Sequence, residues 1–177
     1  GYLIKEYFAN YFLHNNDVTF DLANDRVEIH SKFTEPWKIT LVDTGENTMT
    51  GGRLKRVRHF LEDELFALTY GDGLADINID LLKQNHLSSG KLVTVTAVQP
   101  PGRFGTLSLN NDNSVGSFLE KPNGQGGWIN GGFFLINPVV IDKIKNDQTI
   151  WEQEPLKNLA IENNLNAYKH KGFWQPM

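Results

Sequence analysis

The sequence predicts an α/β protein with a mixed, mainly parallel sheet flanked by helices. Uninterrupted apolar runs at residues 65–70 (LFALTY) and 133–136 (FFLI) are typical of strands that are covered on both faces. These runs alternate with stretches of helical periodicity, which favours parallel pairing of the strands. Two short segments of alternating polarity, residues 17–22 and 25–31, predict a hairpin. We therefore expect the sheet to be mixed.

Periodicity and turn residues place the other elements along the chain. Apolar residues at helical spacing predict helices at residues 2–13, 52–62, 79–86, 139–145 and 154–162. Alternating or β-branched runs predict strands at residues 37–44, 91–98, 104–109, 114–120, 127–137 and 166–170. A stretch rich in Gly, Asn and Thr, residues 45–52, predicts the loop ahead of the second helix.

The composition excludes several classes of function. The chain has 177 residues, 40% hydrophobic and 21% charged, which suits one ordinary globular domain, residues 1–177. Its net charge of −4 gives no electrostatic case for nucleic acid as the main partner. The absence of cysteine excludes disulfides, thiolate nucleophiles and cysteine-based zinc sites, and no apolar run is long enough to span a membrane. Both ends of the sequence suggest that the domain is truncated.

The turn Gly71-Asp72-Gly73 ends the apolar strand at residues 65–70. Asp-Gly is common turn chemistry, but ligands of open α/β sheets bind beyond the carboxyl ends of strands, where this turn lies. A carboxylate there could be a ligand of Mg²⁺, which uses one or two carboxylates and completes its shell with substrate phosphates. The turn and the metal site remain alternatives for Asp72. Asp76 is a weaker candidate ligand, and we expect it to cap the following helix.

The segment TMTGGR, residues 48–53, precedes a predicted helix. Gly51 and Gly52 could present backbone N–H groups to an anion there, and Arg53 would add a bidentate positive charge. The basic residues that follow are expected to lie on a solvated helix face: Lys55, Arg56 and Arg58.

A second polar group ends the predicted strand at residues 114–120. Glu120 could accept hydrogen bonds from a polyol, and Lys121 could contact a phosphate as a point charge. Polar residues that merely close a strand are the alternative. Glycines within strands, Gly105 and the pair after Asn130, permit the close approach of a ligand or mark a β-bulge.

The order of these motifs, GDG, RFG, EKP and NGGFF, resembles that of the sugar-1-phosphate nucleotidyltransferase family. The resemblance is closer to its cytidylyltransferases for glucose 1-phosphate, through segments such as IKEYFANYFLH, TYGDGLAD and WEQEPL, and it covers essentially the whole chain. It implies a Rossmann-like nucleotidyltransferase fold. It also implies a Mg²⁺-dependent reaction of CTP with α-D-glucose 1-phosphate to CDP-glucose and pyrophosphate, for deoxysugar and surface-polysaccharide biosynthesis. The enzyme is expected to be a cytoplasmic homo-oligomer.

The resemblance also implies a role for each matching residue. Asp72 would bind Mg²⁺, and Lys121 would contact the sugar phosphate, so these two are the expected catalytic residues. The residues expected to contact the nucleotide are Thr48, Gly51, Gly52, Arg53 and Gly71. The residues expected to contact the sugar are Gly105, Glu120, Asn130 and Gly131.

Parts of the family pattern lie outside this sequence. Family members carry an N-terminal glycine-rich loop, a lysine after it, and an aspartate directly after the tail that is the second metal ligand. We therefore expect the chain alone to be inactive. A transferase for another nucleotide or hexose phosphate, or a non-catalytic sugar-nucleotide-binding module, remains an alternative. The joint presence of Asp72, Glu120 and Lys121 argues against the module.

Overall fold

The computed structural model describes residues 1–30, 35–100, 106–119 and 127–177. The described residues form two compact units, Gly1–Gly45 and Glu46–Met177. Whether these units belong to one domain, as predicted from the sequence, stays a prediction. In the part of the chain that the structure describes, no helix is both long enough and apolar enough to cross a membrane.

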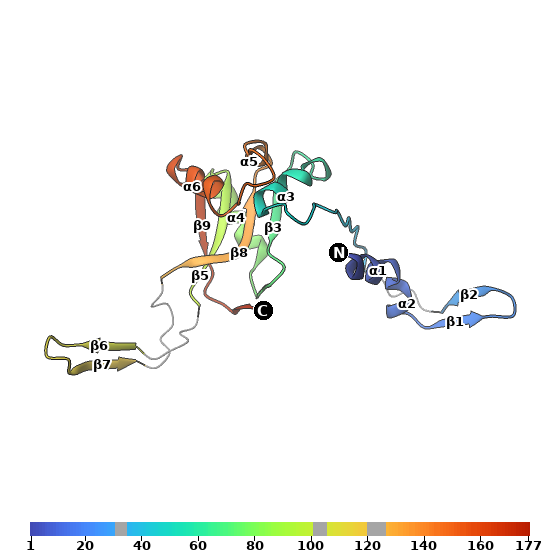
Figure 1. Ribbon diagram of the computed structural model, residues 1–177, viewed down its shortest axis with the longest axis horizontal. Helices are drawn as coiled ribbons and strands as arrows, with labels where there is room; N and C mark the ends of the chain where they lie inside the picture. Colours follow the sequence, from blue (N-terminus) through green and yellow to red (C-terminus); the bar gives the residue numbers. More distant parts are fainter. Residues whose placement is uncertain (31–34, 101–105, 120–126) are drawn as a thin grey trace. The chain divides into compact units, whose positions relative to one another are not determined.

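The first unit contains two short helices and a hairpin (Figure 1), with the bounds α1 Tyr2–Ala9, α2 Tyr11–Asn15, β1 Val18–Asp21 and β2 Arg26–Ile29. The helices confirm the predicted helix at residues 2–13, with a break at Asn10. The Asn10 side chain donates to the carbonyl of Glu6 at 3.0 Å. Such a side-chain bond competes with helical backbone bonding. Antiparallel pairing of Val18 with Ile29 confirms the predicted hairpin.

The predicted strand at residues 37–44 is wrong. Within the described part of the chain, these residues form no strand. An extended segment becomes a strand only when a neighbour takes up its backbone hydrogen bonds, and here no described residue does so. Trp37 accordingly remains 62% exposed.

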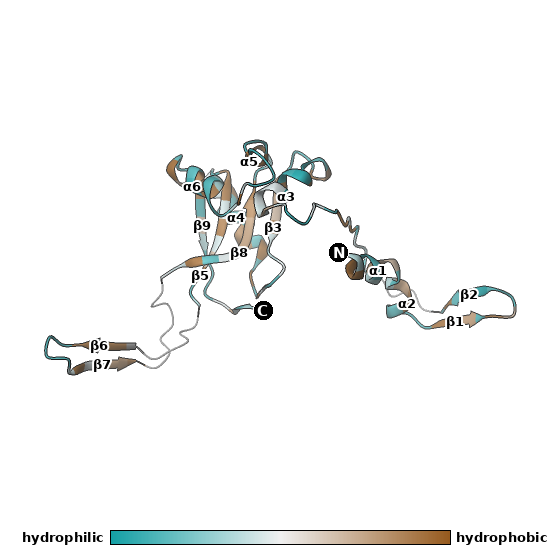
Figure 2. Cartoon of the chain, in the orientation of Figure 1, coloured by the Kyte–Doolittle hydropathy of each residue, from teal (hydrophilic) through white to brown (hydrophobic). Residues whose placement is uncertain are grey.

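The first unit has no hydrophobic core of its own, because none of its described residues, 1–30 and 35–45, is buried. Its apolar residues, which Figure 2 shows on α1 in brown, contact one another at the surface. The ring of Tyr7, for example, lies 5.7 Å from that of Tyr11.

The second unit is built on a four-stranded sheet with the order β3-β8-β5-β9. The bounds are β3 Phe66–Thr69, β5 Val93–Val98, β8 Ile129–Ile136 and β9 Leu165–Lys169. β8 is antiparallel to both β3 and β5, and β9 is parallel to β5. Three strands therefore share one direction and β8 runs against them, which confirms a mixed sheet. Each of these strands overlaps a strand predicted from its apolar or β-branched run.

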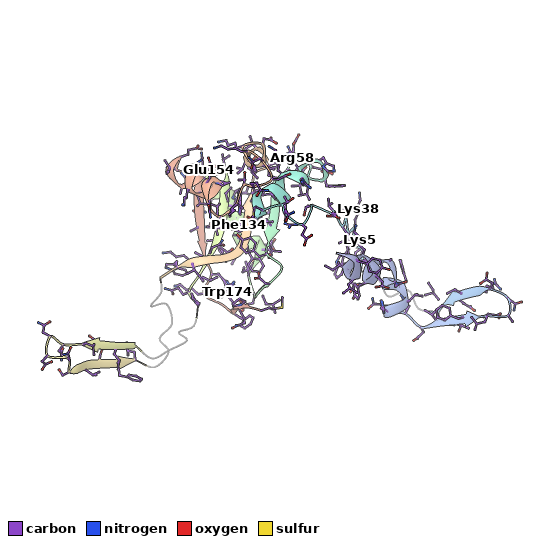
Figure 3. All side chains as sticks on the ribbon, in the orientation of Figure 1. Lys5, Lys38, Arg58, Phe134, Glu154 and Trp174 are labelled. Carbon is purple, nitrogen blue, oxygen red and sulfur yellow. The ribbon has the colours of Figure 1, made fainter. Side chains whose placement is uncertain are left out.

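Helices flank this sheet, which confirms the predicted α/β class. Their bounds are α3 Thr50–Arg56, α4 Ile79–Ser89, α5 Val139–Asp142 and α6 Glu154–Ile161, with a 3₁₀ turn η1 at Arg58–Phe60. The core between helices and strands contains Phe134, labelled in Figure 3, with Leu54, Ile141 and Trp151. Burying such side chains removes apolar surface from water and stabilises the unit.

The basic residues of α3 and η1 do not lie on a solvated face, so this expectation is wrong. Lys55 Nζ donates to the carbonyl oxygens of Ile144 and Lys145, at 2.5 and 3.0 Å. Arg56 pairs with Asp147 at 2.6 Å, and Arg58 pairs with Asp142 and Asp63. These basic side chains attach α3 and η1 to residues 142–147.

Two further strand pairs complete the second unit. The hairpin of β6 Thr106–Leu109 and β7 Val115–Leu119 confirms two predicted strands. The antiparallel pair of β4 Gly73–Ala75 and β10 Trp174–Pro176 was not predicted from the sequence.

Candidate active site

The sheet brings two of the predicted motifs to one edge. β3 ends directly before Gly71-Asp72-Gly73, and β8 begins at Asn130-Gly131-Gly132. Because β8 is antiparallel to β3, the end of one strand lies beside the beginning of the other. The backbone N–H of Tyr70 donates to the carbonyl of Gly132 at 3.0 Å. The structure therefore places the candidate metal residue and the candidate sugar residues at the same edge.

Asp72 lies in the exposed turn between β3 and β4. Its carbonyl accepts a hydrogen bond from the N–H of Met177 at 2.7 Å, which continues the β4–β10 ladder. Gly71 beside it is surrounded by open space, because a Cβ built there would meet no atom within 4 Å. A carboxylate next to open space at a strand end is accessible to a ligand.

The glycines of β8 form a β-bulge, one of the two alternatives raised by the sequence. The register between β5 and β8 shifts at Asn130-Gly131-Gly132, and Gly132 has a φ of +80°. A Cβ on Gly132 would lie 2.9 Å from the Tyr70 ring, so only glycine fits this position. The bulge orients Asn130, whose Oδ1 accepts the N–H of Gly132 at 2.8 Å.

A polar cluster beside the bulge was missed by sequence reasoning. The hydroxyl of Tyr70 accepts from Asn130 Nδ2 at 3.3 Å and donates to the carboxylate of Glu152. The second oxygen of Glu152 accepts from the Thr50 hydroxyl at 2.7 Å. Burial raises the pKa of Tyr70, and the hydrogen bond to Glu152 and the charge of Asp72 raise it further. Tyr70 is thus held as a neutral hydrogen-bond donor.

The segment at residues 48–53 differs from its prediction. The N–H groups of Gly51 and Gly52 donate to the carbonyl of Thr149, at 3.0 and 3.2 Å. The expectation that these N–H groups face an anion is therefore wrong. A Cβ on Gly52 would lie 2.5 Å from the Asp147 carbonyl, so the glycine permits close packing of two backbones. Their role as nucleotide contacts stays a prediction.

The two other predicted nucleotide contacts in this segment lie in different environments. Thr48 is buried, whereas Arg53 is exposed and donates to the carbonyl of Glu46 at 3.1 Å. The guanidinium of Arg53 is therefore in a position to meet a ligand, whereas the side chain of Thr48 is covered by protein.

Asp76 does not cap α4, so that prediction is wrong. The capping residue is Asn78, whose side chain accepts from the N–H of Leu81 at 3.0 Å. Asp76 instead lies 2.9 Å from the buried His170. This contact attaches the loop after β9 to the end of β4.

A cavity of about 530 Å³ lies beside β10. It is lined by Val98, Gln99 and residues 170–175. Trp174, which lines this cavity, donates from Nε1 to the carbonyl of Gly131 at 2.8 Å and so connects the cavity wall to the bulge. Figure 3 shows Trp174 toward the end of the sheet opposite Glu154, where a smaller cavity of about 90 Å³ lies between α5 and α6.

Three of the predicted site residues, Gly105, Glu120 and Lys121, lie outside the described residues. Their expected contacts with the sugar and its phosphate stay predictions. Across the residues that the structure does describe, no group of three or more His, Cys, Asp or Glu side chains could hold a metal ion. A metal bound at Asp72 would therefore need further ligands, such as substrate phosphates.

The sequence pattern of the family described as nucleotidyl transferase matches residues 11–175. The chain belongs to this family. Glucose-1-phosphate cytidylyltransferase of Salmonella typhimurium is 58% identical over 178 residues, which is all of this chain and 69% of that protein. A probable glucose-1-phosphate cytidylyltransferase of Bacillus subtilis is 43% identical over 98% of this chain and 68% of its own length.

Solved structures support the same fold. A putative glucose-1-phosphate thymidylyltransferase from Bacillus anthracis, crystallised in complex with a sucrose, is similar with a TM-score of 0.54 at 14% identity. The match covers 75% of this chain and 57% of that one. The predicted family and the α/β nucleotidyltransferase fold are thus confirmed, and the roles of single residues in this nucleotidyl transferase stay predictions.

Proposed function

We propose that the protein transfers a cytidylyl group from CTP to α-D-glucose 1-phosphate and forms CDP-glucose and pyrophosphate. The observation that carries this proposal is the 58% identity to the Salmonella glucose-1-phosphate cytidylyltransferase along all of the chain. The identity to the mannose-1-phosphate guanylyltransferase of Dictyostelium is 29%, which favours CTP and glucose 1-phosphate over that pair of substrates.

The proposed reaction is a single displacement. A phosphate oxygen of glucose 1-phosphate attacks the α-phosphorus of CTP, and the bond from this phosphorus to the oxygen bridging the α- and β-phosphates breaks as pyrophosphate leaves. The attacking oxygen is already anionic, so little proton transfer is needed. The protein would act mainly by positioning two polyanions and by neutralising charge.

Asp72 is the proposed ligand of Mg²⁺. Its exposed carboxylate is a hard oxygen donor at a strand end, next to the open space at Gly71, and this fits a metal that completes its shell with phosphates. When bound, Mg²⁺ would neutralise charge on the phosphate oxygens. The β4–β10 register brings Met177 beside Asp72, near the place where the family resemblance predicts a second carboxylate.

The glucose 1-phosphate is proposed to bind between the bulge and the cavity beside β10. Asn130 is exposed and its carboxamide is held by two hydrogen bonds, which suits it to contact sugar hydroxyls. The cavity beside β10 carries the exposed Lys171 in its lining, and an ammonium there would attract an anionic sugar phosphate. Lys121 remains the proposed direct contact with the phosphate.

The setting of the enzyme is proposed on weaker grounds. We propose a cytoplasmic homo-oligomer that supplies CDP-glucose to deoxysugar and surface-polysaccharide biosynthesis. The uncovered apolar residues of the first unit, such as Tyr2, Leu3 and Phe12, support an oligomer because exposed apolar groups of this kind favour association.

The test is an assay of the full-length protein with Mg²⁺, CTP and glucose 1-phosphate. We expect CDP-glucose and pyrophosphate in equal amounts, and no product when Mg²⁺ is removed by a chelator. Calorimetry with CTP in the absence of the sugar separates an enzyme from a binding module. Tight CTP binding without any turnover would contradict the proposed reaction.

A further inference from the structure

Glu152 connects two segments that are far apart in the sequence. One carboxylate oxygen accepts a hydrogen bond from the hydroxyl of Thr50, at 2.7 Å and across 102 residues. The other oxygen accepts a hydrogen bond from the hydroxyl of Tyr70, across 82 residues. The carboxylate therefore uses its two oxygens for two different parts of the fold.

The Thr50 side belongs to the segment expected to contact the nucleotide. Thr50 is the first residue of α3, between Thr48 and Gly51. Its hydroxyl oxygen also accepts the backbone N–H of Trp151 at 2.9 Å, so its proton points to Glu152. The beginning of α3 is thereby fixed to Glu152 and to the residue before it.

The Tyr70 side leads to Asn130, which is expected to contact the sugar. Because the Tyr70 hydroxyl donates its one proton to Glu152, its oxygen is left to accept the amide N–H of Asn130 at 3.3 Å. The other end of the Asn130 carboxamide accepts from Gly132. The carboxylate thus determines, through Tyr70, which way the Asn130 amide faces.

We propose that Glu152 is a positioning residue that couples the nucleotide-contacting segment before α3 to the sugar-contacting residue Asn130. This inference rests on the proposed function and adds a residue that the family resemblance did not assign. Hydrogen bonds to an ionised carboxylate are stronger than neutral ones. Glu152 therefore holds both substrate-facing segments in one geometry without touching either substrate.

Three substitutions in the full-length protein separate the two branches. Tyr70→Phe removes the branch to Asn130, and we expect the KM for glucose 1-phosphate to rise about tenfold while the KM for CTP changes less than about twofold. Thr50→Val removes the other branch, and we expect the reverse pattern. Glu152→Gln disturbs both branches and raises both KM values.

A matched control is available two residues along the chain. Glu154 is exposed and pairs with Lys145 at 2.5 Å, away from both branches. We expect Glu154→Gln to leave both KM values and kcat unchanged. In the double variant Tyr70→Phe with Glu152→Gln, the KM for glucose 1-phosphate should rise no further than in the stronger single variant, because both changes interrupt one path.

The outcomes distinguish this inference from the proposed function. If the wild-type protein makes no CDP-glucose, the proposed function fails and the inference fails with it. If the wild type is active but Tyr70→Phe and Thr50→Val change both KM values alike, or change neither, the coupling role is refuted. Should Glu152→Gln fail to fold, the opposite patterns of the two single-branch variants still decide the question.

Discussion

Asp72 is the residue on which the chemistry depends most. The sequence left it as a turn residue or a metal ligand, and the family resemblance favoured the ligand. The structure adds that Asp72 is exposed, at the same sheet edge as Asn130 and beside Met177. An ordinary turn residue would not need this company, so we expect its carboxylate to be required for turnover.

We expect Asp72→Asn to lower kcat by about 100-fold or more, because charge stabilisation at a reacting phosphate is worth several kcal/mol. Since Asp72 is exposed, the variant should unfold at the wild-type temperature. Pyrophosphate release in the full-length protein measures the first effect and circular dichroism the second. The exposed Asp80 on α4 offers a control, since Asp80→Asn should keep wild-type activity. Wild-type turnover in Asp72→Asn would refute the metal assignment.

Other residues of the site could not be predicted from the sequence. Tyr70 and Glu152 are brought together across 82 residues, and neither lies in a pattern that indicates a hydrogen-bond partner. The same holds for Asp76, for which local spacing favoured a helix cap but tertiary packing provides His170 instead. Local patterns identify the residue type that a site needs, whereas long-range contacts decide its partners.

At the scale of elements, the strands with uninterrupted apolar or β-branched runs were predictable, because burial on both faces leaves that signature. The three-residue strands β4 and β10 were not, since they are short and contain glycine and proline. Residues 37–44 carry a strand pattern and yet form no strand among the described residues. A pattern reports the tendency of a segment, whereas a strand also requires a neighbour.

The contact between α3 and residues 147–149 depends on glycine. A Cβ on Gly52 would lie 2.5 Å from the backbone oxygen of Asp147, which cannot move away as a side chain could. We expect Gly52→Ala to lower the free energy of unfolding by about 2 kcal/mol or more. Denaturant titration of the full-length protein measures this. Gly71→Ala is the control with open space around it, and it should change stability by less than about 1 kcal/mol. Equal stability of the two variants would contradict the packing described here.

The contact between α4 and the sheet should depend on pH. His86 is buried, its Nδ1 lies 2.8 Å from the Thr94 hydroxyl, and burial lowers the pKa of its imidazole below the ordinary 6.5. Above the ordinary value both the folded and the unfolded chain are neutral here. As the pH falls below it, the unfolded chain binds a proton that the folded chain does not, so the free energy of unfolding decreases.

The measurement compares unfolding at about pH 8 and about pH 5. We expect His86→Gln to lose part of the acid-induced loss of stability that the wild type shows. His59→Gln, at an exposed histidine, should keep the wild-type difference. An unchanged difference in His86→Gln would show that this histidine does not contribute.

At the scale of the whole molecule, the family was predictable from the order of its motifs, and the fold from periodicity. The first unit was predictable in its helix and hairpin, but its lack of a buried core was not, because amphipathic patterns do not reveal whether a partner is present. The proposed function combines the exposed edge at Asp72, the bulge at Asn130 and the relatives that use one nucleotide and one sugar phosphate.

The central claim is that this edge joins CTP to glucose 1-phosphate. The most direct measurement gives the full-length protein glucose 1-phosphate with CTP, UTP and dTTP together at equal concentration, and identifies the products by mass spectrometry. We predict that CDP-glucose accounts for nearly all of the product and that it disappears in Asp72→Asn. A dominant UDP-glucose or dTDP-glucose signal, or CDP-glucose that persists in Asp72→Asn at the wild-type rate, would contradict it.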